Sequence, residues 1–196
     1  MKTLNQHTPA SQHGMSLIEV MVAVFVVSIG LLGVARMEIL AKQSNVEAIQ
    51  RTAATQLAQQ IITKMRANPS QLTAYEGQIL GAGKLKLGTD CATKTCTSAE
   101  LAAWDLYQWE QALMGASEKT TSTGTNAGGL DSPRGCITGP AGGVVGEYVI
   151  SIAWRGKSPM TNPTSTTCGN GLSLYGTNDE YRRVLTLTLY ISNTGA

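Results

Sequence analysis

The side chains that most often do chemistry are sparse and unevenly placed in this sequence. The two histidines, His7 and His13, both precede a long apolar run. The rest of the chain therefore offers no imidazole to a nucleophile pair or to a histidine-bound metal. One carboxylate, Glu19, stands inside the apolar run, where a charge costs roughly 2.5–3.5 kcal/mol at the bilayer centre and less near the interface. These features argue against a hydrolase and make Glu19 the residue that most needs a partner.

Other candidate sites fail on spacing. The stretch from Gly77 to Lys84 is glycine-rich, but its spacing is one residue too long for a phosphate loop, and Leu85 stands where Ser or Thr is needed. No G-x-S-x-G motif occurs, and the scattered Asp and Asn residues do not define a calcium loop. The charge cluster Asp179-Glu180 and Arg182-Arg183 is interpreted as a solvated or subunit-contacting surface. The sequence thus predicts no catalytic residue, no metal site and no cofactor.

The apolar run itself predicts a membrane helix. Between Met15 and Ala35 the only charge is Glu19, and Arg36 ends the run. As a helix this run is about 31 Å long, close to the thickness of one bilayer core. It could be a signal peptide cleaved after Ala35, a permanent anchor, or a helix whose Glu19 is neutralised by a partner.

The net charge of +2 gives no reason to expect nucleic acid as a partner.

The residues around Glu19 carry a family resemblance. Gly14-Met15-Ser16-Leu17-Ile18-Glu19-Val20-Met21 resembles the N-terminal signal of type IV pilins and type II secretion pseudopilins. The resemblance implies a leader that ends at Gly14, cleavage there by prepilin peptidase, and N-methylation of Met15. Cleavage creates an ammonium at Met15. In a bundle of stacked helices, Glu19 of one subunit and the ammonium of a neighbour can then neutralise each other.

The helix is expected to continue beyond the apolar run. No Gly or Pro interrupts the chain from Val34 to Ala67, and Asn68-Pro69 then ends the helix. The predicted helix, Met15–Ala67, is about 80 Å long. Apolar residues repeat every four positions in its second half and predict a face packed under a head; they are Ile49, Ala53, Leu57, Ile61 and Met65. The expected organisation is a leader (1–14), a transmembrane or filament-core half (15–36), an amphipathic periplasmic half (37–68) and a globular head (69–196).

The head is predicted to be an α+β fold with a small antiparallel sheet. Thr97-Ser98-Ala99-Glu100 is a capping box that opens a helix through Met114. Alternating residues predict two strands, from Tyr148 to Trp154 and from Val184 to Ile191. Residues 118–134 are expected to form an exposed loop, and the long 156–181 connection to be either functional or stapled. The predicted buried stripe of the helix is Ala102, Leu106, Trp109 and Leu113, with Trp104 also assigned to the core.

All four cysteines lie in the part of the chain that would face the periplasm. An even number in an oxidising compartment predicts two disulfides, for which three pairings are possible. We favour Cys91–Cys96, a tight local loop, and Cys136–Cys168, which would tie the long connection to the start of the sheet. A four-cysteine zinc site is the alternative, but the spacings contain no C-x₂-C pair.

The head carries a second set of residues with a family resemblance: Cys96–Ala102, Asp105-Leu106, Trp109, Leu113, Tyr148–Trp154, Cys168-Gly169, Leu174–Gly176 and Arg182–Val184. In these residues the head sequence resembles that of minor type IV pilins. The resemblance implies a non-enzymatic subunit that helps initiate pilus assembly, sits at or near the tip, and supports twitching, adhesion or DNA uptake indirectly. It implies as partners the prepilin peptidase, other minor pilins, the major pilin, the inner-membrane assembly platform and the membrane. The alternatives are a minor pseudopilin of type II secretion and, from another class, a secreted adhesin released after Ala35.

Overall fold

The computed structural model describes residues 14–116, 118–124, 126 and 128–192. The predicted leader up to His13 lies outside the described residues. The chain divides into two compact units, residues 1–44 and 45–196. Both contain part of one long helix, α1 (Leu17–Ala67).

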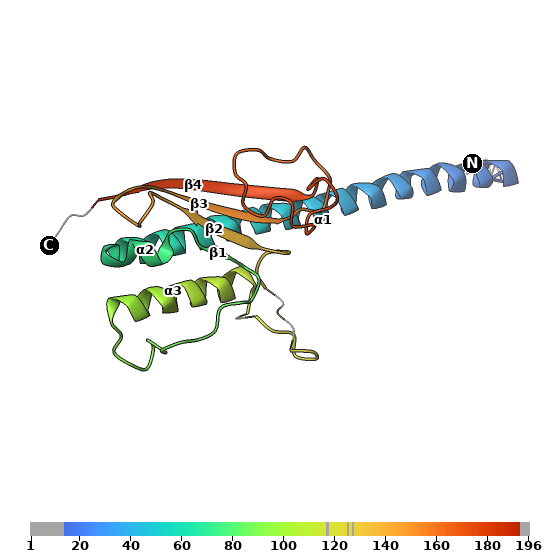
Figure 1. Cartoon of the computed structure of the whole chain (residues 1–196). Coiled ribbons are helices and arrows are strands. Elements are labelled where there is room, and N and C mark those ends of the chain that lie inside the picture. The colour runs from blue at the N-terminus through green and yellow to red at the C-terminus, as the bar shows by residue number, and fades with distance from the viewer. Residues whose placement is uncertain (1–13, 117, 125, 127, 193–196) are drawn as a thin grey trace, which may run out of the picture. The chain divides into compact units, whose positions relative to one another are not determined.

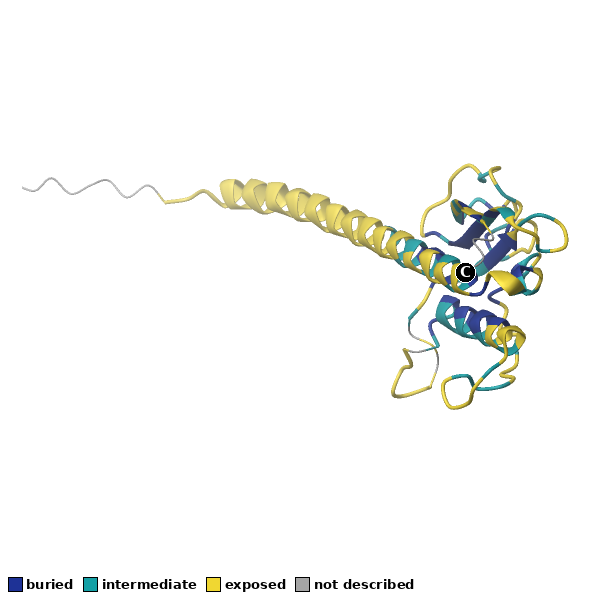
Figure 2. Ribbon diagram, turned by 90° about the vertical axis from the view of Figure 1, so that its left-hand side faces the viewer, coloured by how far each residue is buried: buried dark blue, intermediate teal, exposed yellow. Residues whose placement is uncertain are grey.

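Helix α1 begins two residues later than the sequence predicted. The carbonyl of Ser16 accepts the first helical hydrogen bonds, from the backbone N–H groups of Glu19 (3.0 Å) and Val20 (3.3 Å). Ser16 therefore takes the position of the N-cap, and Met15 lies outside the helix. In the first unit every described residue is exposed, as the colouring by burial shows (Figure 2). The helix ends at Ala67, where the sequence predicted, because Pro69 follows two residues later.

The buried face of α1 in the second unit matches the predicted one in part, since Ile61 and Met65 are fully buried as predicted. Its fully buried residues are Ala54, Ala58, Ile61 and Met65, whereas Ile49 is 67% exposed. The predicted residues Ala53 and Leu57 are only partly buried. The two alanines in this face, Ala54 and Ala58, let neighbouring elements approach the helix closely. Small side chains as well as large ones therefore decide which face of α1 is buried.

A four-stranded sheet confirms the predicted antiparallel architecture. Its strands are β1 (Ile79–Leu80), β2 (Arg134–Thr138), β3 (Gly146–Arg155) and β4 (Arg182–Ile191). They run in sequential order, and every neighbouring pair is antiparallel. The predicted strands form the centres of β3 and β4. Strands β1 and β2 were not predicted because both are too short to show a clear alternation. The residues of β3 predicted to face the core are buried: Tyr148, Ile150, Ile152 and Trp154.

Helix α3 (Ser98–Leu113) completes the core of the head. Its capping box forms as predicted, with reciprocal hydrogen bonds between Thr97 and Glu100. In the head, α1 lies between the sheet and α3 (Figure 1). The indole N–H of Trp109 donates to the carbonyl of Leu57 on α1 (2.9 Å). Gly135 on β2 must lack a side chain, since a Cβ there would lie 2.6 Å from the Trp109 ring. All four predicted core positions of α3 are buried.

Short elements and loops account for the remaining differences. A 3₁₀ turn, η1 (Pro69–Gln71), and a one-turn helix, α2 (Leu72–Tyr75), follow α1 and were not predicted. The prediction of an exposed loop over 118–134 is wrong at its end, where Leu130 is buried in the core and β2 begins at Arg134. The backbone N–H of Leu130 donates to the carbonyl of Leu113 (3.1 Å), which ties this segment to the end of α3.

The long connection between β3 and β4 packs on the outer face of the sheet. The prediction of a solvated or subunit-contacting charge cluster is wrong for two of its four residues, Asp179 and Arg182. Arg182 is only 1% exposed, and Asp179 is also buried. The guanidinium of Arg182 donates to the backbone carbonyls of Cys168 (2.7 Å), Thr166 (3.1 Å) and Pro163. Five fixed donors suit Arg to this task, because a loop without regular structure has many carbonyls to satisfy. The buried Arg182 side chain therefore holds the folded 156–181 connection together.

Candidate functional site

The predicted processing site lies in open backbone at the start of the first unit. Gly14, Met15 and Ser16 precede α1 and adopt no regular structure. Met15 is 73% exposed. A Cβ built at Gly14 would meet no atom within 4 Å. The peptide bond between Gly14 and Met15 is therefore accessible to an enzyme, and nothing in the described part of the fold explains why residue 14 is glycine.

Glu19 occupies the first turn of α1, where a negative charge interacts favourably with the helix dipole. The side chain is exposed. Within the part of the chain that the structure describes, its carboxylate makes no hydrogen bond or ion pair. The structure thus places Gly14, Met15 and Glu19 on one short segment, but it supplies no partner for the carboxylate from the same chain.

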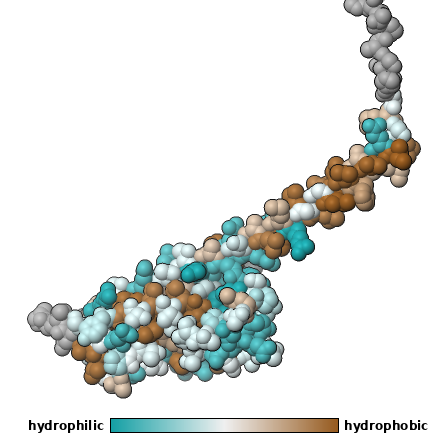
Figure 3. All heavy atoms as spheres, turned by 90° about the horizontal axis from the view of Figure 1, so that it is seen from above, coloured by the Kyte–Doolittle hydropathy of each residue, from teal (hydrophilic) through white to brown (hydrophobic). Residues whose placement is uncertain are grey.

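The surface that follows Glu19 is apolar on all sides. Among the described residues, α1 is the one helix long and apolar enough to cross a membrane, with a mean hydropathy of 2.6 over its most apolar window and none of that window buried. Figure 3 shows apolar residues gathered along this helical segment. A continuous apolar surface of this extent requires lipid or other helices as its environment. Its large exposed residues include Leu17, Ile18, Met21, Phe25, Leu31 and Leu32.

The four cysteines form two disulfides in the head. Cys91 is bonded to Cys96 and Cys136 to Cys168, which is the pairing that loop length favoured. Cys136 lies on the outer face of β2, opposite Ser151 of β3. The second bond therefore fixes the 156–181 connection to the sheet. No group of His, Cys, Asp or Glu among the described residues could hold a metal ion.

We expect the two disulfides to contribute unequally to stability. They close loops with sequence separations of 32 and 5 residues. The chain-entropy model assigns about 3–4 kcal/mol to the first and about 2 kcal/mol to the second. The double variant Cys136→Ser/Cys168→Ser should therefore melt at a lower temperature than Cys91→Ser/Cys96→Ser, as measured by near-ultraviolet circular dichroism. Changing both cysteines of a bond leaves no free thiol to form new pairs. Equal melting temperatures would contradict the expectation.

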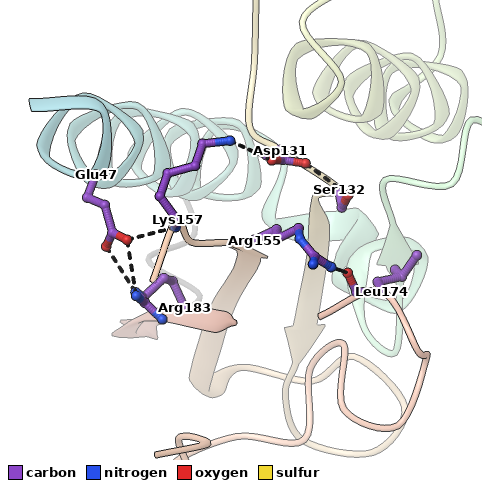
Figure 4. Close-up of polar contacts among 7 residues, drawn as sticks. All are labelled: Glu47, Asp131, Ser132, Arg155, Lys157, Leu174 and Arg183. Carbon is purple, nitrogen blue, oxygen red and sulfur yellow. Dashed lines mark hydrogen bonds and ion pairs between the residues drawn. The ribbon is translucent and has the colours of Figure 1, made fainter. Parts of the chain in front are cut away.

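A polar cluster that the sequence did not reveal holds α1 to one end of the sheet, where β3 ends and β4 begins. Glu47 accepts hydrogen bonds from the guanidinium of Arg183 (3.0 and 3.1 Å) and from the backbone N–H of Lys157 (2.8 Å), as Figure 4 shows. Lys157 in turn reaches the carboxylate of Asp131 (3.0 Å). Burial raises the pKa of Glu47, but the hydrogen bonds from Arg183 and Lys157 outweigh it and hold the pKa below its ordinary value.

A second unforeseen carboxylate, Glu110, organises the glycine-rich stretch that resembled a phosphate loop. Glu110 is 1% exposed. One of its oxygens accepts the backbone N–H groups of Gly81 (3.1 Å), Ala82 (3.2 Å) and Gly83 (3.1 Å), and the other accepts that of Leu85 (2.8 Å). The stretch thus holds an anion, but the anion is the chain's own carboxylate. In the sequence, the burial of Glu110 was indicated by its position next to Trp109, along the helix face predicted to be buried.

These hydrogen bonds predict an acid-sensitive head. Burial raises the pKa of Glu110, but the hydrogen bonds from the backbone donors outweigh it and hold the pKa below its ordinary value. A carboxylate whose pKa is lower in the folded state than in the unfolded state stabilises the head at pH values above its unfolded-state pKa. This stabilisation is lost as the pH falls through the folded-state pKa. Glu110→Gln places an amide N–H₂ among backbone donors and should cost about 2–3 kcal/mol at neutral pH.

The measurement is urea unfolding of the full chain at several pH values. The wild type should lose stability as the pH falls below about 5, where carboxylates begin to protonate, and Glu110→Gln should lose less over the same range. Glu147→Gln is the matched control, because Glu147 is exposed and its carboxylate has no bonding partner in the described structure. A wild-type pH dependence retained in full by Glu110→Gln would exclude this role for Glu110.

Comparison with known protein families agrees with this arrangement. Residues 9–35 match the model of the prokaryotic N-terminal methylation motif, and residues 37–107 match the model described as type IV pilin Tt1218. No curated protein and no solved structure matches the chain in the same comparisons.

The long apolar helix, the methylation motif at its start and the α+β head together define a type IV pilin. The chain belongs to the type IV pilin family, whose members are structural subunits and not enzymes. Within that family its matched region is that of the Tt1218-like pilins. The methylation motif implies processing by prepilin peptidase and use of the pilus assembly machinery.

Proposed function

We propose that this chain is a minor pilin of the PilV type, also called pilus modification protein, that helps initiate pilus assembly and sits at or near the pilus tip. The observation that carries the proposal is the exposed apolar helix that starts just after Gly14. Its first turn presents a carboxylate, Glu19, that has no partner among the described residues. The head adds support through the residues that resemble those of minor pilins, which include Asp105, Trp109 and Arg182.

The proposed processing follows from the same segment. Prepilin peptidase cleaves after Gly14, and the new N-terminus at Met15 is methylated. The leader (1–14) is removed, residues 15–36 span the inner membrane and later the filament core, and residues 37–68 carry the head (69–196) in the periplasm. On assembly the subunit leaves the membrane and becomes part of an extracellular pilus, together with other minor pilins and the major pilin.

Two other functions share some of these features. A minor pseudopilin of type II secretion would use the same signal. The four-cysteine head of this chain is the feature that favours a pilin instead. A secreted adhesin released after Ala35 would need no carboxylate at Glu19, which costs free energy in a membrane and would serve no purpose there.

Deletion of the gene distinguishes the pilin from the pseudopilin. The proposal expects fewer pili in sheared surface fractions and unchanged secreted hydrolases, with pili restored by the wild-type gene. Normal pili together with a loss of secreted hydrolases would exclude the minor pilin and favour the pseudopilin.

A further inference from the structure

Trp104 lies at the surface of the head and not in the core to which the sequence assigned it. Its side chain is half-buried, whereas Trp109, five residues later on α3, is fully buried. The ring of Trp104 stacks with that of Tyr107, with 6.1 Å between the ring centroids and 28° between the ring planes. Two adjacent half-exposed aromatic rings contribute little to the core of this head, so their presence at the surface calls for another explanation.

The two rings border a hollow between α1 and α3. Its volume is about 450 Å³, within the range of small-ligand sites. The small side chain of Ala112 leaves room between the two helices, and no charged side chain lines the hollow. The lining residues are Gln60 from α1 and Trp104, Tyr107, Gln108, Gln111 and Ala112 from α3.

The polar groups of this hollow are amides and a hydroxyl that are available to a ligand. Among the residues that the structure describes, the hydroxyl of Tyr107 and the amides of Gln60 and Gln111 have no hydrogen-bond partner. The carbonyl oxygen of Gln108 accepts from Lys64 Nζ (2.8 Å), which leaves the N–H₂ group of Gln108 as a donor. Each free amide offers one acceptor and two donors side by side.

We propose that this hollow binds a neutral saccharide. The C–H face of a pyranose ring is apolar and packs on an aromatic ring, and its hydroxyl groups both donate and accept hydrogen bonds. The two rings and the amides match these two requirements. No cationic side chain lines the hollow, and Lys64 beside it is paired with Asp105 (3.0 Å), so the hollow does not favour acidic sugars.

A proline-rich peptide is the other ligand that aromatic grooves commonly bind. Such a peptide presents mainly carbonyl acceptors and few donors. It would leave the amide oxygens of Gln60 and Gln111 unpaired on binding, which costs free energy. The balance of donors and acceptors therefore favours the saccharide, and binding of a peptide is an alternative outcome of the test.

The test titrates the full chain, held in a zwitterionic detergent without a sugar headgroup, with neutral tetrasaccharides. One arm uses a β-1,4-linked glucose tetramer and the other its N-acetylated counterpart, which separates a plain glucan from an N-acetylated envelope polysaccharide. Binding is followed by calorimetry and by tryptophan fluorescence. We expect saturable binding of at least one tetramer and a loss of about tenfold or more in affinity for Trp104→Ala. Gln111→Ala should weaken binding by a smaller factor.

The control variant is Leu101→Ala, on the same helix but outside the hollow and partly exposed, which should bind as the wild type does. Circular dichroism checks that Trp104→Ala remains folded. The proposal is overturned by the absence of binding of either tetramer at about 10 mM, by binding that Trp104→Ala does not change, or by binding of a proline-rich decapeptide in place of the saccharides. Because the readout is binding by the isolated chain, its failure leaves the proposed role in pili untouched.

Discussion

Glu19→Gln should leave cleavage after Gly14 intact and sharply reduce the amount of this subunit in sheared pili. The amide keeps the shape of the side chain but removes its charge. The ammonium of a neighbouring subunit is then left unpaired in an apolar bundle, and removing one partner of such a buried pair costs several kcal/mol, about 3–5 in measured cases. Processed protein should accumulate in the inner membrane, as judged by immunoblots of pili and membranes.

A second carboxylate on the same helix provides the matched control. Glu38 is exposed and forms an ion pair with Lys42 one turn away (2.8 Å). Exposed pairs of this kind contribute little to stability. Glu38→Gln should therefore enter pili at the wild-type level. Normal incorporation of Glu19→Gln would remove the charge-pairing role of Glu19, although it would not affect membership of the pilin family.

Gly14→Val should block processing altogether and leave the whole precursor in the membrane. A Cβ at residue 14 meets no atom within 4 Å, and residue 14 precedes α1, so the substitution should not disturb the fold. Any defect must therefore arise where the peptidase binds the segment. The expected result is a precursor band in membrane immunoblots and no subunit in the pili.

Gly33→Ala controls for a change in the apolar helix itself, because residue 33 also has open space around it. This variant should be cleaved normally. Cleavage of Gly14→Val at the wild-type rate would show that the peptidase recognises another site, and the proposed leader of 14 residues would be wrong.

Local sequence signals predicted the two long helices, α1 and α3, and the two long strands, β3 and β4, but not the short elements between them. The uninterrupted run from Val34 to Ala67 and the following Pro69 predicted the end of α1, and the capping box of Thr97 and Glu100 predicted the start of α3. Each of these signals depends on residues only a few positions apart. The N-terminal signal around Gly14 is local in the same way, which explains why the sequence alone identified it.

The polar interior of the head could not be predicted in the same manner. Glu47 and Arg183 are 136 residues apart, and neither residue type indicates which partner it will meet. Arg182 and Asp179 resembled a surface cluster because charged neighbours are usually solvated, and their burial depends on how the 156–181 connection folds over the sheet. The predicted buried face of α1 was wrong at Ile49 for a similar reason, since the small alanines helped to decide which face of the helix packs against the head.

The most direct test of whether this chain is a processed type IV pilin is the N-terminus of the protein isolated from cells, determined by intact mass and by sequencing of the N-terminal peptide. A processed pilin begins at Met15 and carries one added methyl group on its α-amino nitrogen. A chain that begins at Arg36 would identify a conventionally secreted protein and contradict pilin processing, and so would an unprocessed chain that begins at Met1.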